Sequence, residues 1–343
     1  MMKQWGLILL LSCAALTAGA SNTTVALSSD DAAVAQSNDD AAVSQSSDDA
    51  AVAQSSDDAV VAQSNDDAVV AQSSDDSMVT LKSGDMTMTI DPLKGGKILS
   101  LKYQDKEVLS QSRWPESFGS TFWTSPQKEW NWPPVAEFDK QPYTIHENSA
   151  GRLVISSPVS ERLGLSVGKD MRVADSNGMP AFVITYSIKN EGQDARHVAP
   201  WEITRVANVG GMIFFAPTDS IWPAGVMNFE LSGEVAWYTT DEAQQNRKVN
   251  ANGQGWLAYS ADGLLLVKRF QDLKAGEEAP GEAEVQVYVN RGKTYIELES
   301  QGAYTLLKPG EQLQWTVTWL LMPTDAAPNR ETLMNLIKGV KGQ

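Results

Sequence analysis

Alternation of apolar and polar residues dominates the chain from Met78 onward. Segments such as "MTMTID", "RLVISS" and "EVQVYV" place an apolar side chain at every second position, which is the period of a β-strand with one buried face. Gly, Pro, Asn and Asp separate these segments, as expected of turns. Many such segments with almost no helical period between them predict an all-β domain, built as an antiparallel sandwich.

Two patterns near the C-terminus predict particular elements. Residues 284–289 and 294–300 form alternating segments joined by "NRGK", which predicts a hairpin. Asn329 is a predicted N-cap for a helix that we expect to pack on the sandwich. The apolar positions of this C-terminal helix recur at helical spacing: Leu333, Leu336, Ile337 and Val340.

The first 76 residues follow a different pattern. A lysine, an apolar run and the small residues Ala18-Gly19-Ala20 predict a signal peptide over residues 1–20. Residues 21–76 contain a nine-residue repeat, first "SSDDAAVAQ", that lacks aromatic residues, leucine and glycine. Such an acidic composition of small residues cannot bury a core, and it predicts a disordered spacer. We therefore expect one folded domain, over residues 77–343.

Cys13 is the only cysteine, and it leaves two forms of the exported protein open. Cleavage after Ala20 would remove the thiol and release a periplasmic or secreted protein. Alternatively, "LLSC" is a lipobox, and Cys13 becomes the lipid anchor of a lipoprotein of the cell envelope. A spacer suits a domain held away from a membrane, although a secreted protein could carry one too.

Charge and motif content exclude several function classes. The net charge is −16, but the repeat alone holds twelve aspartates, and residues 77–343 carry 31 acidic and 26 basic residues. No basic patch suggests a nucleic-acid partner. The sequence contains no GxGxxG, Walker loop, HExxH or GxSxG motif. With two histidines and no cysteine outside the signal, a transition-metal site is not expected, and no cofactor is predicted.

Two segments resemble the galactose-mutarotase-like superfamily, the relatives of the aldose epimerases. "TIDPLKGGKILSLKYQDKEVL", residues 89–109, is similar to the family's opening strands with their Gly-Gly turn, and "KTYIELESQGAYTLLKPGEQLQWTVTW", residues 293–319, resembles its closing strands. The resemblance extends over residues 77 to about 325 and is closest to an exported bacterial branch of unknown function. It implies a β-supersandwich, a monosaccharide or oligosaccharide ligand and, where the chemistry is kept, an isomerase.

The same resemblance assigns Glu297 in "YIELES" to the family's general base, which removes the proton of the anomeric hydroxyl while a histidine protonates the ring oxygen. In "RHVAPWEITRV", residues 196–206, it puts Trp201 or Glu202 where that histidine belongs. His197 lies four or five residues too early, which puts plain mutarotation in doubt. Strand alternation places Trp201 and Arg205 on one face and Glu202 on the other.

Two interpretations of this strand follow. In the functional one, Glu297 and Glu202 are the catalytic residues, and Trp201 and Arg205 contact the substrate across a cleft. In the structural one, Glu202 and Arg205 form an ion pair between sheets, and Glu297 points into solvent. A buried carboxylate at Glu202 would need such a partner, because an unpaired buried charge costs several kcal/mol.

A proline-rich segment with four tryptophans, residues 113–135, is predicted to be a loop that presents indoles to a ligand. Flat indole faces suit the C–H faces of pyranose rings, and Gln127 offers a partner for hydroxyl groups. Two of the tryptophans would more usually fill the core. A second segment, "GGMIFFAPTDSIWPAG", is either another wall of the cleft or a hairpin with a buried Trp222. The candidate binding residues of the loop are Trp123, Trp130, Trp132 and Gln127; Trp114 completes the set of indoles.

Three functions are compatible with these features. The first is an exported carbohydrate-binding domain with an aldose-epimerase-like activity. The second is a non-catalytic glycan-binding or envelope-associated module. The third is an accessory domain of a polysaccharide lyase or hydrolase, although the sequence places no Tyr with a His or Asn near a uronate-binding Arg.

Overall fold

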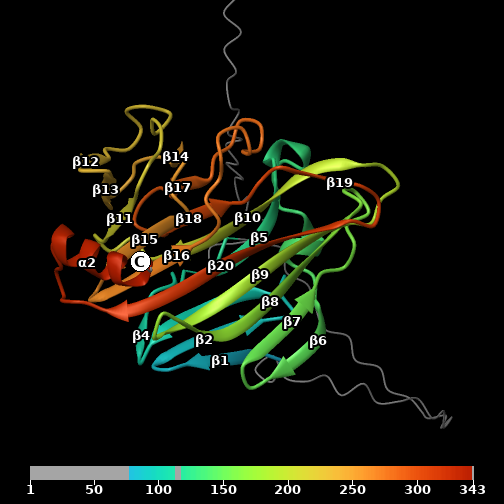
Figure 1. The fold of residues 1–343 in the computed structure, drawn as a ribbon, viewed down its shortest axis with the longest axis horizontal. Coiled ribbons are helices and arrows are strands. Elements are labelled where there is room, and N and C mark those ends of the chain that lie inside the picture. Colours follow the sequence, from blue (N-terminus) through green and yellow to red (C-terminus); the bar gives the residue numbers. More distant parts are fainter. Residues whose placement is uncertain (1–76, 113–116, 342–343) are drawn as a thin grey trace, which may run out of the picture. The chain divides into compact units, whose positions relative to one another are not determined.

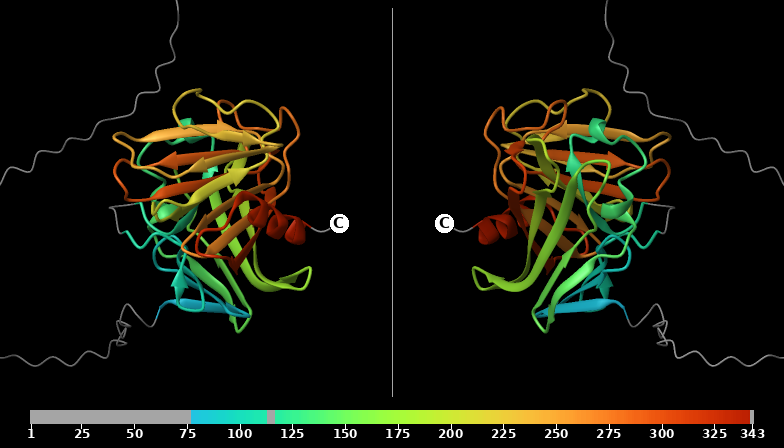
Figure 2. Two further views of the ribbon diagram at one scale, coloured as in Figure 1. Left: turned by 90° about the vertical axis from the view of Figure 1, so that its left-hand side faces the viewer. Right: turned by 90° about the vertical axis from the view of Figure 1, so that its right-hand side faces the viewer.

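A computed structural model describes residues 77–112 and 117–341. The predicted signal peptide, the repeat, Cys13 and Trp114 lie outside these residues. The two principal layers are antiparallel sheets, as the sequence predicts (Figures 1 and 2). The expected all-β sandwich is therefore confirmed.

The first sheet contains ten strands. Its main path runs in the order β1 (Val79–Ser83), β2 (Met86–Asp91), β3 (Lys97–Tyr103), β5 (Ser120–Ser125), β10 (Arg196–Val206), β18 (Ile296–Gln301), β17 (Val285–Val289) and β14 (Arg247–Ala251). Two short strands lie off this path: β4 (Lys106–Glu107) pairs with β3, and β19 (Thr305–Leu307) pairs with β10. The hairpin predicted near the C-terminus is β17–β18, and both faces of β18 are largely buried.

The second sheet also contains ten strands. They follow the order β12 (Glu230–Ser232), β13 (Val235–Thr239), β11 (Met212–Phe215), β15 (Trp256–Ala261), β16 (Leu264–Arg269), β20 (Gln312–Pro323), β9 (Met179–Asn190), β8 (Leu165–Ser176), β7 (Arg152–Ser156) and β6 (Thr144–Ser149). In Figure 1 the strands from β20 to β6 follow one another in this order.

The core lies between the sheets, where apolar side chains of both layers are buried. Phe122 of β5 stacks on Tyr186 of β9, with ring centroids 4.4 Å apart, so the two layers are in direct contact. The layers are also joined by a fully buried ion pair between Glu202 of β10 and Lys268 of β16.

Helices are few in the described part of the chain. Two short ones, η1 (Gln127–Glu129) and α1 (Ala136–Asp139), follow β5, and α2 (Arg330–Lys341) follows β20. Asn329 caps α2 as predicted, because its Oδ1 accepts a hydrogen bond of 2.8 Å from the Thr332 N–H. Leu333 and Ile337 pack on the outer side of the second sheet, which confirms the expected docking of this helix (Figure 2). Among the described residues, no helix has the length and apolar character needed to cross a membrane.

Candidate functional site

The candidate site lies on the face of the first sheet that points away from the second sheet. In the antiparallel pairing of β10 with β18, Trp201 lies opposite Gln301, Ile203 opposite Glu299 and Arg205 opposite Glu297. Residues opposite each other share a face of a sheet. The structure therefore brings Trp201, Arg205 and Glu297 together, on the surface that we call the site face.

Arg205 and Glu297 form an ion pair on this face. The Arg205 Nη2 lies 2.7 Å from the Glu297 Oε1, and Nη1 donates to the Phe118 carbonyl at 3.4 Å. The guanidinium also lies over the rings of Trp123 and Tyr295, 5.7 and 5.8 Å from their centroids. The Arg205 side chain is buried, whereas that of Glu297 is 12% exposed. Glu297 is thus the member of the pair that can meet a ligand.

Glu299 is a buried carboxylate that the sequence did not single out for the site. Its Oε2 accepts hydrogen bonds from the Trp201 Nε1 at 2.8 Å and from the Lys248 Nζ at 2.9 Å. Its Oε1 is buried and has no hydrogen-bond partner within the described part of the chain. Burial raises the pKa of Glu299 to about 7, although the attraction of Lys248 opposes this shift.

Lys248 and Tyr288 extend the site face toward the edge of the sheet. Lys248 of β14 lies opposite Tyr288 of β17, which in turn lies opposite Glu297. The Lys248 Nζ lies 4.8 Å from the centroid of the Trp201 ring, and its side chain is 30% exposed. Burial raises the pKa of Tyr288 well above its usual value, so its hydroxyl is a neutral donor and acceptor. Lys248 was not predicted from the sequence, because the alternation in "RKVNA" does not show which strand lies beside this one.

The tryptophan segment is only partly the loop that the sequence predicted. Residues 120–125 form strand β5, which pairs with β10 and places Trp123 opposite Trp201. Trp123, Trp130 and Trp201 are buried and contact one another, with ring centroids 5.4 to 6.2 Å apart. Trp132 is 48% exposed and lies edge-on to Trp123 at 6.2 Å. Among the described indoles of this segment, Trp132 alone is exposed to solvent.

Gln127 lies at the rim of the cluster, where Glu282 fixes the chain. The Gln127 backbone N–H donates to the Glu282 Oε1 at 2.6 Å. The other oxygen of Glu282 accepts from the Ser125 hydroxyl at 2.5 Å and from the Gln301 amide at 2.6 Å. The Gln127 side chain is half-buried. This network holds the turn after β5 against the end of β18.

Asp139 of α1 supports the β5 side of the face. Its Oδ1 accepts from the Lys97 Nζ at 2.5 Å and from the Thr121 hydroxyl and Trp123 Nε1 at 2.9 Å each. Burial lowers the pKa of Lys97 to about 8, and the attraction of Asp139 works against this shift. These bonds fix the orientation of the Trp123 ring.

Glu202 does not belong to the site face. It points between the sheets, where it pairs with Lys268 and accepts from the Ser120 hydroxyl at 2.9 Å. Glu202 and Glu297 therefore lie on opposite sides of the sheet, and the structure does not bring the predicted catalytic pair together. The ion pair expected between Glu202 and Arg205 is wrong as well, because Arg205 pairs with Glu297 on the other face.

Neither histidine lies near the Arg205–Glu297 pair. His197 is exposed near the start of β10, where its ring stacks on Tyr304 at 5.2 Å. Eight residues separate it from Arg205 along the strand, a distance of about 26 Å. His146 is an exposed residue of β6, in the second sheet, and hydrogen-bonds to the Ser156 hydroxyl at 2.7 Å.

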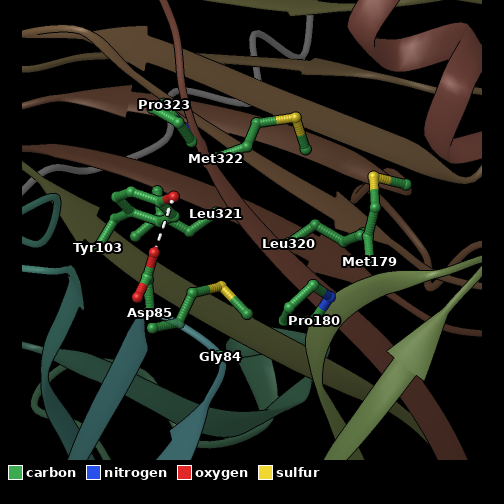
Figure 3. A pocket seen from close by; sticks show the side chains of 10 residues that line it. Gly84, Asp85, Tyr103, Met179, Pro180, Leu320, Leu321, Met322 and Pro323 are labelled. Carbon is green, nitrogen blue, oxygen red and sulfur yellow. Dashed lines mark hydrogen bonds between the residues drawn. The ribbon is translucent and has the colours of Figure 1, made fainter.

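Two cavities are lined by residues other than the Arg205–Glu297 pair and the tryptophan cluster. One, of about 390 Å³, is mainly apolar, and the Tyr103 hydroxyl donates to Asp85 at its edge (Figure 3). It is lined by Gly84, Asp85, Met86, Tyr103, Met179, Pro180 and residues 320–323. The other, of about 500 Å³, is lined by residues between Pro217 and Leu231. Within residues 77–112 and 117–341, no group of three or more His, Cys, Asp or Glu is arranged to hold a metal ion.

Comparisons with known proteins identify the fold. No protein-family model matches the sequence, and no curated protein does. A candidate aldose 1-epimerase from Escherichia coli K12 superposes with a TM-score of 0.53 at 11% identity, over 72% of this chain and 99% of that one. A galactose mutarotase-like protein from Lactobacillus casei ATCC 334 gives 0.52 at 11% identity, over 71% and 100%. A TPR-domain containing protein from Parabacteroides distasonis ATCC 8503 gives 0.51 at 14% identity, over 75% and 48%.

At these identities the similarity establishes the fold and nothing finer. The chain has a galactose-mutarotase-like fold, which confirms the resemblance found in its opening and closing strands.

Proposed function

We propose that this protein binds a carbohydrate on the site face. The observation that carries the proposal is the convergence of the Arg205–Glu297 ion pair, Lys248 and Tyr288 on one surface beside the tryptophan cluster. Sugars combine apolar C–H faces with hydroxyl groups, so their binding sites need flat rings together with hydrogen-bonding groups. The structural neighbours among aldose-epimerase-like proteins support the same class of ligand.

The roles of the residues follow from their exposure. Glu297, Lys248 and Tyr288 reach solvent and can accept or donate hydrogen bonds to hydroxyl groups. Trp132 offers an exposed ring for stacking, whereas Trp123, Trp130 and Trp201 form a buried floor. Arg205 lies beneath the surface and holds the Glu297 carboxylate in place. Charge-assisted bonds of this kind are short and directional, so they preorganise the site.

A second candidate function is aldose epimerisation, which the placement of Glu297 favours. A carboxylate base would take the proton from the anomeric hydroxyl, the bond from C1 to the ring oxygen would break, and an acid would protonate that oxygen. Because both histidines lie elsewhere, the Lys248 ammonium or the Tyr288 hydroxyl would have to supply this proton. The ring would then close on the other face of C1, with each proton returned.

Anomer exchange separates the two candidates. We expect saturation-transfer NMR of common aldoses to show exchange faster than in buffer with the native chain, and a loss of about a hundredfold or more for Glu297→Gln. If neither protein exceeds the buffer rate while glycan binding is retained, the chain is a non-catalytic binding module. If no glycan in a broad array binds and no anomer exchange is seen, the carbohydrate proposal fails.

We further propose that the protein is exported, with the repeat as a spacer before the folded domain. The N-terminal segment "KQWGLILLLSC" and the Ala-Gly-Ala site support this proposal. Mass spectrometry of the mature chain distinguishes its two forms. A start at Ser21 identifies a periplasmic or secreted protein, whereas a start at a lipid-modified Cys13 identifies a lipoprotein.

A further inference from the structure

Trp222 is a second exposed tryptophan, and it is bound to the outer edge of the first sheet. Its side chain is exposed to 38%, which is comparable with Trp132. The Trp222 N–H donates to the Asn250 carbonyl at 2.9 Å, and the Asn250 N–H donates to the Trp222 carbonyl at 2.7 Å. This isolated antiparallel bridge continues the sheet by one position beyond β14.

The register places Trp222 on the site face. Asn250 lies opposite Gln286, and Gln286 lies opposite Glu299, which is a residue of that face. Because opposite residues share a face, Trp222 points to the same side as Glu299. Its neighbours in sequence, Ile221 and Pro223, line the 500 Å³ cavity instead.

The two exposed tryptophans are too far apart to contact one sugar ring. Trp132 touches Trp123 on β5, and from β5 the sheet continues through β10, β18, β17 and β14 to Trp222. These five steps correspond to about 24 Å along the sheet. Glu297, Tyr288 and Lys248 are partly exposed and lie on strands of this path, two residues along each strand from the row of Trp222, in which Gln286 and Glu299 are buried. The surface has aromatic ends and a polar centre, and it is several pyranose rings long.

The cations of the site face each lie beside a carboxylate, and Glu282 at its rim adds a carboxylate whose hydrogen-bond partners are neutral. Arg205 lies against Glu297, and Lys248 lies 2.9 Å from Glu299. Neither cation is left to neutralise a uronate or a sulfate. The surface therefore suits a polymer without charge.

We propose that the site face binds a neutral linear oligosaccharide that runs across the strands from Trp132 to Trp222, an inference that rests on the proposed carbohydrate function. The terminal rings stack on the two indoles, and the hydroxyl groups of the central rings meet Glu297, Tyr288 and Lys248. A monosaccharide makes only part of these contacts, so affinity increases with chain length.

Isothermal titration calorimetry of the full chain tests this proposal. The probes are neutral glucose, galactose, mannose and xylose series of one to six units, with oligogalacturonate as the charged comparison. We expect the Kd of a bound series to fall with length. Trp222→Ala should weaken binding of the longest member at least about tenfold and leave monosaccharide binding unchanged. The control is Leu231→Ala, which removes another exposed apolar side chain, 69% exposed, from β12 of the second sheet.

The outcomes separate this inference from the proposed function. If monosaccharides bind but affinity does not change with length, or if Trp222→Ala changes nothing, the extended surface is refuted and the carbohydrate proposal stands. Tighter, salt-sensitive binding of oligogalacturonate would overturn the assignment to neutral chains. If no probe of any length binds, both proposals fail.

Discussion

Removal of the buried ion pair between Glu202 and Lys268 should show what these charges contribute to stability. Both side chains are fully buried between the sheets, and Glu202 also accepts hydrogen bonds from the hydroxyls of Ser120 and Ser300. Lys268→Met leaves the carboxylate without its counter-ion, a change that costs about 3 to 5 kcal/mol in buried pairs. The hydroxyl donors to Glu202 remain, so we expect the free energy of unfolding to fall by about 3 kcal/mol, the lower end of this range.

A double-mutant cycle isolates the pair. Glu202→Gln keeps partners for the hydroxyls and removes the charge, so the double variant Glu202→Gln with Lys268→Met should be more stable than the sum of the single changes predicts. The coupling should be about 1 to 3 kcal/mol. For a domain of this size, 3 kcal/mol lowers Tm by roughly 6 to 12 °C.

Urea unfolding followed by tryptophan fluorescence provides the measurement. The matched control is Arg330→Met, which breaks the exposed pair of Arg330 with Glu230 and should cost less than about 1 kcal/mol. A loss below about 1 kcal/mol for Lys268→Met, or strictly additive changes in the cycle, would refute the reasoning.

Three further predictions follow from other parts of the structure. Burial lowers the pKa of Lys169 to about 7, so the unfolded chain binds more protons than the folded chain between about pH 7 and 10.5, and this lysine destabilises the fold less as pH rises. From pH 7 to 9, the unfolding free energy of the native chain in urea should increase by about 2 kcal/mol relative to that of Lys169→Met. An unchanged difference between the two proteins would contradict the burial effect. Trp132→Ala should weaken glycan binding at least about tenfold with a Tm close to native, and a large drop in Tm would mean that this half-exposed ring supports the fold instead. Gly95→Ala should lower the free energy of unfolding by more than about 2 kcal/mol, because Gly95 has φ +66° and an added Cβ would lie 2.4 Å from the Asp139 carbonyl oxygen. A native Tm by calorimetry would show that the turn can adjust.

Local patterns in the sequence were sufficient to predict the class of fold and several elements. Strand alternation depends only on position along the strand, so Trp201 and Arg205 could be placed on one face of β10 and Glu202 on the other. The cap of α2 is equally local, because Asn329 bonds to a residue three positions away. Strand β5 was missed because "STFWTS" is buried on both faces and therefore lacks alternation. The surrounding prolines favoured a loop instead.

The partners across the sheets could not be predicted in the same way. Arg205 meets Glu297 because β10 lies beside β18, and Glu202 meets Lys268 because the two sheets pack face to face. Both contacts join residues far apart in the chain, which a periodic pattern does not specify. For the same reason Lys248 became visible as part of the site face only from strand order, and strand order was needed to decide between the two predicted places of Trp222.

Tryptophan indole signals offer the most direct test of carbohydrate binding on the site face. Chains labelled with ¹⁵N-tryptophan would be titrated with a bound glycan, after assignment of each indole N–H by Trp→Phe substitution. We predict that the signals of Trp132 and Trp201 shift on titration, while those of Trp237 and Trp319 in the second sheet stay in place. Shifts confined to Trp237 and Trp319 would contradict the assignment of the binding site to the first sheet.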